Sequence, residues 1–150
     1  MILAGRNHVG LSEREVDYCQ KAWKLLCGDK SIELITGKAS QHSSRTQFNE
    51  SDGKVYLGAD VKPGVGIEAN ARMSILACLA HELAHADRSH SGFVRPLALP
   101  DALIDEAETS LHASFNTVLN SKDREDLVED ARDRLNQWFV ERKLTSEVEP

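Results

Sequence analysis

Two histidines flank a glutamate near the middle of the chain, in the sequence His81-Glu82-Leu83-Ala84-His85. On a helix, residues four apart lie on one face, so both imidazoles can reach the same ion. Zinc binds neutral imidazole nitrogen at ~2.0–2.1 Å. Glu82 would lie beside such a metal without having to bind it, where it can act as a general base. The spacing therefore indicates metal-assisted hydrolysis, with His81 and His85 as metal ligands and Glu82 as the catalytic residue.

A catalytic zinc ion normally has three protein ligands and one open position, so a third ligand must be found. One extended form of the motif continues to a glycine at position 88 and a histidine at position 91. This chain has Arg88 and Ser91 at those positions, and His90 is displaced by one residue. His90 is therefore a weak candidate for the third ligand.

The stronger candidates are acidic residues on the helix expected next in the chain. Glu106 shares a helical face with small residues, which would let that helix approach the histidine helix closely. Asp105 and Glu108 remain as rivals, and a solvated acidic cluster near a helix start is the alternative for all three. The expected site is one Zn²⁺ per chain held by His81, His85 and Glu106.

Residues outside the ligand set are less well specified. A histidine that binds a metal usually donates its other N–H group to a carboxylate, carbonyl or similar acceptor, and the candidates here are Asp87, Asp105 and Ser110. A group that stabilises developing negative charge should also exist. The candidates are Tyr56, His90, Arg95 and His112, and the sequence does not choose among them.

Helices and short strands must position these residues. Ser12 and Glu15 form a capping-box pattern that opens a helix, which Gly28 ends. Strands are expected at Ser31–Thr36, Arg45–Phe48 and Lys54–Leu57, and helices at Glu68–Arg88, at Asp101–Leu119 and from Ser121 onward. The last helix carries an apolar stripe of Leu127, Ala131, Leu135, Trp138 and Phe139.

This order predicts an α+β fold with a small, mostly antiparallel sheet packed on a helical layer. Its 150 residues suit one domain, expected over 1–144, followed by a frayed acidic tail at 145–150. The formal net charge of −6 argues against a nucleic-acid partner. No segment is long and apolar enough for a membrane span, and the three cysteines are expected as buried free thiols of a cytoplasmic protein.

The motif residues resemble those of the gluzincin peptidases, in which an H-E-x-x-H helix is followed by a glutamate on the next helix. The closer resemblance is to the small ImmA/IrrE-type metallopeptidases, and it covers about Lys54 to Phe115. Residues 106–114 match the shape of the family's E-x-x-A-N-x-F-A motif, although Thr109 and Ser110 replace Ala-Asn and His112 replaces Phe. The resemblance implies a zincin-like fold, and it carries over only the three ligands and Glu82.

The resemblance also implies what such a protein would act on. It suggests a zinc-dependent endopeptidase that cleaves a specific protein in bacterial stress or phage defence, with a protein or peptide substrate and room for an activating partner. In zincins, a strand beside the active-site helix holds the extended substrate, which makes Tyr56 on the strand Lys54–Leu57 a candidate substrate-binding residue. The alternative is a non-catalytic zinc-binding regulatory protein on a degenerate peptidase fold.

Overall fold

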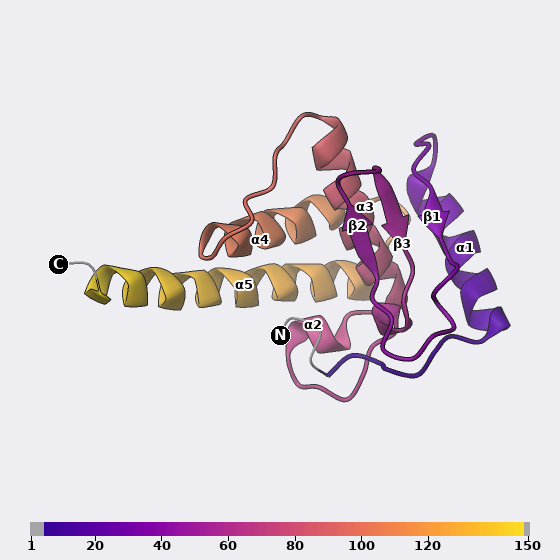
Figure 1. Cartoon of the computed structure of the whole chain (residues 1–150), viewed down its shortest axis with the longest axis horizontal. Coiled ribbons are helices and arrows are strands. Elements are labelled where there is room, and N and C mark those ends of the chain that lie inside the picture. Colours follow the sequence, from indigo (N-terminus) through magenta and orange to yellow (C-terminus); the bar gives the residue numbers. More distant parts are fainter. Residues whose placement is uncertain (1–4, 149–150) are drawn as a thin grey trace.

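The computed structural model describes residues 5–148, with the side chains of 145–148 left out. A small sheet and a group of helices pack together in an α+β arrangement (Figure 1). The helix α3 (Ile75–His90) contacts the sheet and α1 (Glu13–Cys27) as well as α4 (Asp101–Ala113) and α5 (Ser121–Val148). The histidine motif therefore lies on an element that has partners on several sides.

The sheet has three short strands: β1 (Leu34–Ile35), β2 (Gln47–Asn49) and β3 (Lys54–Tyr56). Their spatial order is β1-β3-β2, with β2 antiparallel to β3 and β1 parallel to β3. The sheet is mixed, so the expected mostly antiparallel pairing is only half correct. A tight turn joins β2 to β3, which leaves only the far edge of β3 for β1.

The first helix confirms its sequence signals. The Ser12 hydroxyl accepts the backbone N–H of Glu15, and the Glu15 carboxylate accepts the backbone N–H of Ser12. Gly28 has a φ of 57° at the helix end, a conformation that costs a glycine little. The residues Cys19, Trp23 and Leu26 on the apolar face of α1 are buried.

The segment expected as one helix over Glu68–Arg88 is two helices, α2 (Ala69–Arg72) and α3. The break lies at Ser74, whose hydroxyl caps α3 by accepting the backbone N–H of Ala77. The same hydroxyl donates to Asp123 at 2.7 Å, and the Ser74 N–H donates to Asp126 at 3.1 Å. Both acids belong to α5, so tertiary contacts stabilise a new helix start inside the predicted helix.

The last two helices also differ from expectation at their ends. α4 stops at Ala113 instead of Leu119, and the following segment is tied to α1 by the Asn116 amide, which donates to the Leu26 carbonyl at 3.0 Å. α5 continues through Val148, so the tail expected to fray over 145–150 is helical as far as it is described, and 149–150 lie outside the described residues.

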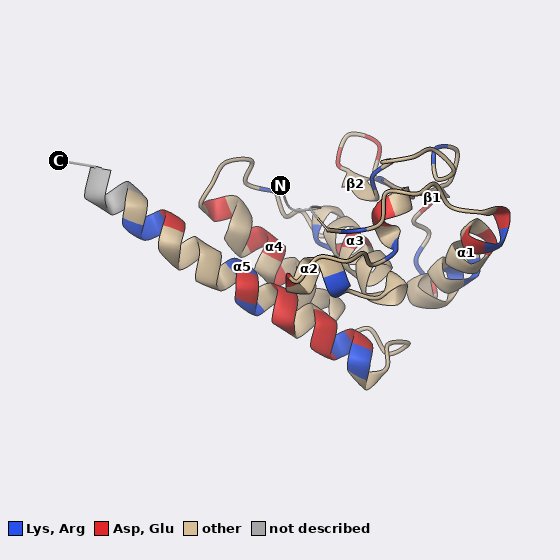
Figure 2. Ribbon diagram, turned by 90° about the horizontal axis from the view of Figure 1, so that it is seen from below, with Lys and Arg blue, Asp and Glu red and all other residues tan. Residues whose placement is uncertain are grey.

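The apolar stripe of α5 is buried only where the helix has neighbours. Leu127 and Ala131 are buried, whereas Phe139 is 65% exposed. Figure 1 shows the reason, because the C-terminal end of α5 extends beyond the other helices. Charged residues of both signs cover much of α5 (Figure 2). Among the helices of the described part, none combines the length and apolar character that a membrane crossing requires.

The apolar core lies between α1, the sheet and α3. It includes Cys19, Trp23, Val55, Leu57 and Leu79, all of which have 5% of their surface exposed or less. The three cysteines are buried and free, as expected. The core continues to Ala113 of α4 and Leu127 of α5, but α4 and α5 also bury polar side chains, and the candidate site lies there.

Candidate metal centre

The helix α3 places His81 and His85 one turn apart, with their side chains directed toward α4. Their rings meet edge to face, with centroids 4.7 Å apart and an interplanar angle of 86°. Both are almost completely buried, with 5% and 3% of their surfaces exposed. Two buried imidazoles need partners for four ring nitrogens, because an unsatisfied buried polar atom is costly.

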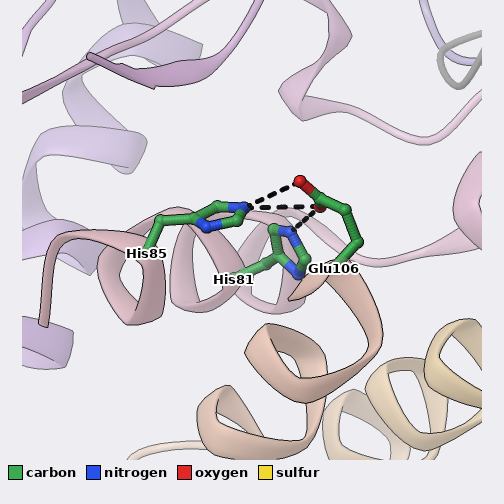
Figure 3. A group of neighbouring side chains, drawn as sticks. All are labelled: His81, His85 and Glu106. Carbon is green, nitrogen blue, oxygen red and sulfur yellow. Dashed lines mark hydrogen bonds and ion pairs between the residues drawn. The ribbon is translucent and has the colours of Figure 1, made fainter. Parts of the chain in front are cut away.

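Glu106 of α4 brings its carboxylate to both rings (Figure 3). One carboxylate oxygen lies 2.8 Å from His81 Nε2, and the two oxygens lie 3.3 and 3.2 Å from His85 Nε2. The potential ligand atoms of the three residues all lie within 4.8 Å of one another. The structure thus brings together the two histidines and the glutamate that the sequence predicted as metal ligands.

The rival third ligands lie elsewhere. Asp105 faces Arg88 and Arg95, and Glu108 pairs with Arg88 at the helix surface. His90, at the end of α3, is exposed and does not belong to the cluster. Among the acids proposed from the sequence, only Glu106 approaches the imidazoles.

Two hydroxyl groups fix the orientation of the imidazole rings. The Ser110 hydroxyl donates to Asp130 at 2.6 Å, so its oxygen is left to accept the Nδ1–H of His81, 2.8 Å away. The Thr109 hydroxyl donates to the Asp105 carbonyl at 2.7 Å and can accept the Nδ1–H of His85 at 3.4 Å. Each ring can therefore donate its Nδ1–H to a hydroxyl oxygen and direct Nε2 at the common point, which is the orientation that a metal ligand requires.

Among the predicted partners of the rings, Ser110 is confirmed and Asp105 acts only through its main-chain carbonyl. Asp87 pairs with Lys30 and His112, away from the site. Thr109 and Ser110 are two of the positions at which the chain departs from the ImmA/IrrE-type pattern. Their hydroxyls give these departures a physical role, because each one supports a ring.

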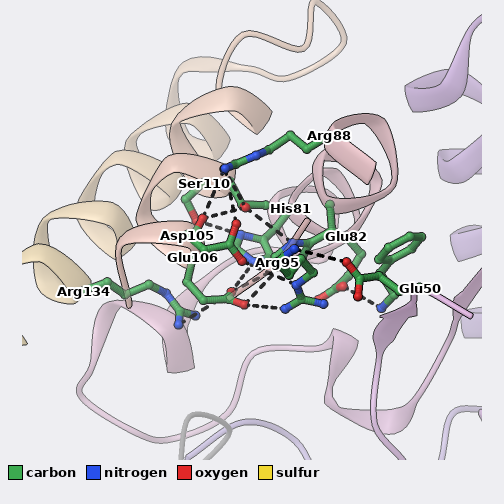
Figure 4. Close-up of polar contacts among 12 residues, drawn as sticks. Glu50, His81, Glu82, Arg88, Arg95, Asp105, Glu106, Ser110 and Arg134 are labelled. Carbon is green, nitrogen blue, oxygen red and sulfur yellow. Dashed lines mark hydrogen bonds and ion pairs between the residues drawn. The ribbon is translucent and has the colours of Figure 1, made fainter. Parts of the chain in front are cut away.

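A second layer of charged side chains surrounds the cluster (Figure 4). Arg134 of α5 donates to Asp130 at 2.9 Å and lies 3.8 Å from a Glu106 oxygen. Arg95, from the segment between α3 and α4, donates to Glu106 at 2.9 Å and approaches Asp105 at 3.4 Å. Both arginines stabilise the ionised carboxylate of Glu106.

The charges of the cluster are strongly coupled. Burial opposes ionisation of Glu106, but hydrogen bonds to His81 and His85 outweigh it and hold the pKa of that carboxyl well below its usual range. Burial lowers the pKa of His85 to about 4. Burial also lowers the pKa of His81, but the hydrogen bond to Glu106 and the negative charge of Glu106 have a larger combined effect, so the pKa of His81 is raised. One ionised acid beside two imidazoles is a donor set that suits a dication.

The donor set suits zinc, and part of its spacing matches a tetrahedral ion. Ligand atoms at ~2.0–2.1 Å from a tetrahedral ion are about 3.3–3.4 Å apart. The two His85–Glu106 separations of 3.2 and 3.3 Å are close to that value, and the His81–Glu106 separation of 2.8 Å needs a small withdrawal of the carboxylate. His81, His85 and Glu106 would hold the ion.

Glu82 lies on the same turn of α3 but is not part of the ligand cluster. One of its oxygens accepts the backbone N–H of Phe48 on β2 at 2.9 Å. Burial raises the pKa of Glu82 to about 7, and the charge of Glu106 adds to this effect. A carboxyl group with a pKa near neutrality can both accept and donate a proton at physiological pH.

A pocket with a volume of about 190 Å³ joins these groups. His81, Glu82, His85 and Glu106 line it, together with residues of β2 and the arginines 6, 45, 95 and 134. Tyr56 does not line it, and its hydroxyl donates to Asp52 beside the β2–β3 turn. β3 is the central strand, so β2 presents its outer edge beside Glu82 instead.

Sequence reasoning did not find Asp130 and Arg134, and it left Arg95 as one of four equal candidates. A signal for the first two exists, because they lie four residues apart on α5 beside Leu127 and Ala131, which are buried. A charged pair on the core side of a helix must find partners there. Arg95 has no such signal, since it belongs to an irregular segment.

Comparisons with known proteins identified no related protein. No family model matches the chain, and no curated protein or solved structure is significantly similar to it.

Proposed function

We propose that this protein is a zinc-dependent endopeptidase of the zincin type, similar to the ImmA/IrrE-type metallopeptidases. The observation that carries the proposal is the arrangement of two buried histidines and two half-buried glutamates in one pocket. Two imidazoles with their Nε2 atoms facing the Glu106 carboxylate form a three-ligand set, and Glu82 lies beside it without joining it. A purely structural zinc site normally has four protein ligands and has no use for the extra carboxylate.

When zinc is bound, it supplies Lewis acidity, which polarises a carbonyl group and makes water a stronger acid. Glu82 would then take a proton from water in the pocket as that water attacks the carbonyl carbon, and return it to the amine as the carbon–nitrogen bond breaks. Ser110 and Thr109 keep both rings oriented throughout. Arg95 and Arg134 keep Glu106 ionised.

The outer edge of β2 is the proposed place for the substrate main chain. The Phe48 N–H on this edge donates to Glu82, so a peptide lying along β2 would bring one of its bonds beside the proposed catalytic groups. The pocket volume of about 190 Å³ accommodates a side chain, not a whole peptide. Most of a substrate would therefore lie outside it, which favours a protein substrate and leaves a role for an activating partner.

The test compares metal content and peptide hydrolysis in three proteins. The wild type should bind one zinc ion per chain and cleave a peptide library in a chelator-sensitive way. Glu82→Gln should keep the zinc and lose about 10²–10⁴-fold in rate. His85→Ala should lose the metal and the stabilisation that it provides.

Glu108→Gln is the matched control, because Glu108 pairs with Arg88 at the surface of α4. It should keep both zinc and activity. Full activity in Glu82→Gln would refute the peptidase. Zinc binding without hydrolysis of any peptide by the wild type would favour the non-catalytic zinc protein instead.

A further inference from the structure

The charge of the pocket differs from the charge of the whole protein. Four arginines line it against three carboxyl groups, those of Asp60, Glu82 and Glu106. A bound dication would make the pocket still more positive, although the chain has a formal net charge of −6. Such local concentration of one charge in a cleft selects ligands of the opposite sign.

Three of the four arginines are occupied by groups of the protein itself. Arg6 is buried and donates to the main-chain carbonyls of Asp60, Val61, Asn70 and Met73. Arg134 is held by Asp130 and Glu106. Arg95 pairs with Glu106 and Asp105. These three guanidinium groups build the site.

Arg45 is different. Its side chain is exposed, and within the described part of the chain it has no hydrogen bond or ion pair. Burial raises the pKa of the Asp60 carboxyl, and the positive charge of Arg45 offsets part of that rise. An arginine at a pocket wall with an unused guanidinium can bind a carboxylate through two parallel hydrogen bonds.

The backbone holds Arg45 in a defined place. Gly58 packs directly against it, because a Cβ at that glycine would come within 2.3–2.6 Å of Arg45 main-chain atoms. The neighbouring Thr46 hydroxyl donates to the Gly58 carbonyl at 3.2 Å and accepts the Gly58 N–H at 3.0 Å. Arg45 therefore starts from a fixed main chain, and only its side chain is free to adapt.

The strand pattern sets where Arg45 would meet a substrate. Arg45 and Thr46 directly precede β2, and in this stretch Arg45 and Gln47 are exposed whereas Thr46 and Phe48 are buried. This alternation is that of an extended chain, so Arg45 and Gln47 share a face. Arg45 precedes Phe48, whose N–H contacts Glu82, by three residues, which is about 10 Å of extended chain. The N–H groups of Thr46 and Phe48 already donate to Asp60 and Glu82. A substrate lying along this edge would therefore be held mainly by its side chains, and one of them, two or three residues from the cleaved bond, would lie beside Arg45.

From this geometry we infer that the site selects acidic peptides, and that Arg45 is the specificity-determining residue that binds a substrate aspartate or glutamate near the cleaved bond. This inference rests on the proposed function, because it names the substrate class of the same site. A peptide is favoured over a nucleic acid because the unused positive charge is one side chain in a small pocket, not a broad basic face on an acidic protein.

The experiment uses two labelled peptides that differ only in glutamate or glutamine at alternate positions. Binding is measured by fluorescence anisotropy at low salt, with and without added Zn²⁺, in the Glu82→Gln background. The glutamate peptide should bind roughly three- to tenfold more tightly. Arg45→Gln should remove this difference without changing affinity for the glutamine peptide, and Arg45→Lys should keep part of it.

Arg14→Gln is the matched control, since it removes the same charge from an exposed position on α1 outside the pocket. It should preserve the difference. Equal binding of the two peptides, or a difference that survives Arg45→Gln, would overturn the inference. So would a short oligonucleotide that binds through Arg45 more tightly than the glutamate peptide.

Hydrolysis of both peptides by the zinc-loaded protein with the native Glu82 separates the two proposals. Cleavage at equal rates would overturn the acidic preference and support the peptidase. Arg45-dependent binding of the glutamate peptide, with no cleavage of either peptide, would overturn the peptidase and support the acidic ligand site.

Discussion

The helix α3 has two kinds of neighbour, and they are held to it by different forces. Toward α1 and the sheet, its contacts are apolar and include Leu79 and Leu83, each with 2% of its surface exposed or less. Toward α4 and α5, it meets a connected set of hydrogen bonds that runs from His81 through Ser110 to Asp130. The apolar side tolerates changes of shape gradually, whereas the polar side depends on every member keeping its partner.

The largest expected effect is on stability, from a cavity on the apolar side. Leu79→Ala removes a completely buried side chain and should lower the free energy of unfolding by about 2–5 kcal/mol. Urea denaturation measures this change. Zinc affinity of the folded variant should stay close to that of the wild type, because Leu79 is not part of the hydrogen-bonded set.

Leu25→Ala on α1 provides the control, since Leu25 is 65% exposed. Its free energy of unfolding should change by less than about 0.5 kcal/mol. A Leu79→Ala variant that loses zinc but keeps its stability would contradict the division between the two sides.

On the polar side, the expected effect is on metal affinity. Ser110→Ala removes the acceptor of the His81 Nδ1–H and should weaken zinc binding by about 10–100-fold. Competition with a chromophoric chelator measures the zinc dissociation constant directly. The same variant leaves Asp130 without its hydroxyl donor, so a smaller loss of stability should accompany the change.

Thr109→Val is the matched comparison at the other ring. The Thr109 oxygen lies 3.4 Å from His85 Nδ1, against 2.8 Å for the Ser110 oxygen and His81. The longer contact is weaker, so Thr109→Val should reduce zinc affinity less than Ser110→Ala does. The reverse order would show that the ring hydrogen bonds do not control affinity.

The smallest expected effect concerns Asp60, which lines the pocket near β2 and has one carboxylate oxygen without a hydrogen-bond partner. Burial raises the pKa of Asp60 in the folded protein, so the folded state binds a proton more tightly than the unfolded state. That stabilising contribution is complete below the ordinary pKa of about 4 and is lost as pH rises through the raised value. Relative to Asp60→Asn, the wild type should lose stability as pH increases.

Urea denaturation of both proteins across this pH range tests the sign of the effect. Asp29→Asn, at an exposed position, should change the free energy of unfolding by less than about 0.5 kcal/mol. A wild type that gains stability over Asp60→Asn as pH rises would mean that the Asp60 carboxylate is favoured by its surroundings.

The two sides of α3 were not equally predictable. The helix period revealed the apolar residues and placed His81 and His85 on one face, because both patterns depend on neighbours within one helix. Glu106 followed from the need for a third ligand on the next helix. Asp130 and Arg134 could not be assigned, because their role depends on how α5 packs against α4, and no local rule gives that packing.

The errors in the predicted fold also come from contacts between residues that are distant in the sequence. The break at Ser74 depends on Asp123 and Asp126, which are about fifty positions away in the chain. The parallel pairing of β1 with β3 joins residues 21 positions apart, such as Leu34 and Val55, at the edge of β3 that β2 leaves free. In both cases the local sequence permits two outcomes, and a distant contact decides between them.

Arg6 joins parts of the chain that are far apart in the sequence. Its guanidinium joins the carbonyls of Asp60, Val61, Asn70 and Met73, at sequence separations of 54 to 67 residues. Contacts between such distant residues form slowly, because a long loop must close before they are rewarded. During synthesis, the contacts of Arg6 can be complete only after Met73 has emerged, and the pocket that Arg6 lines also requires Arg134 of α5.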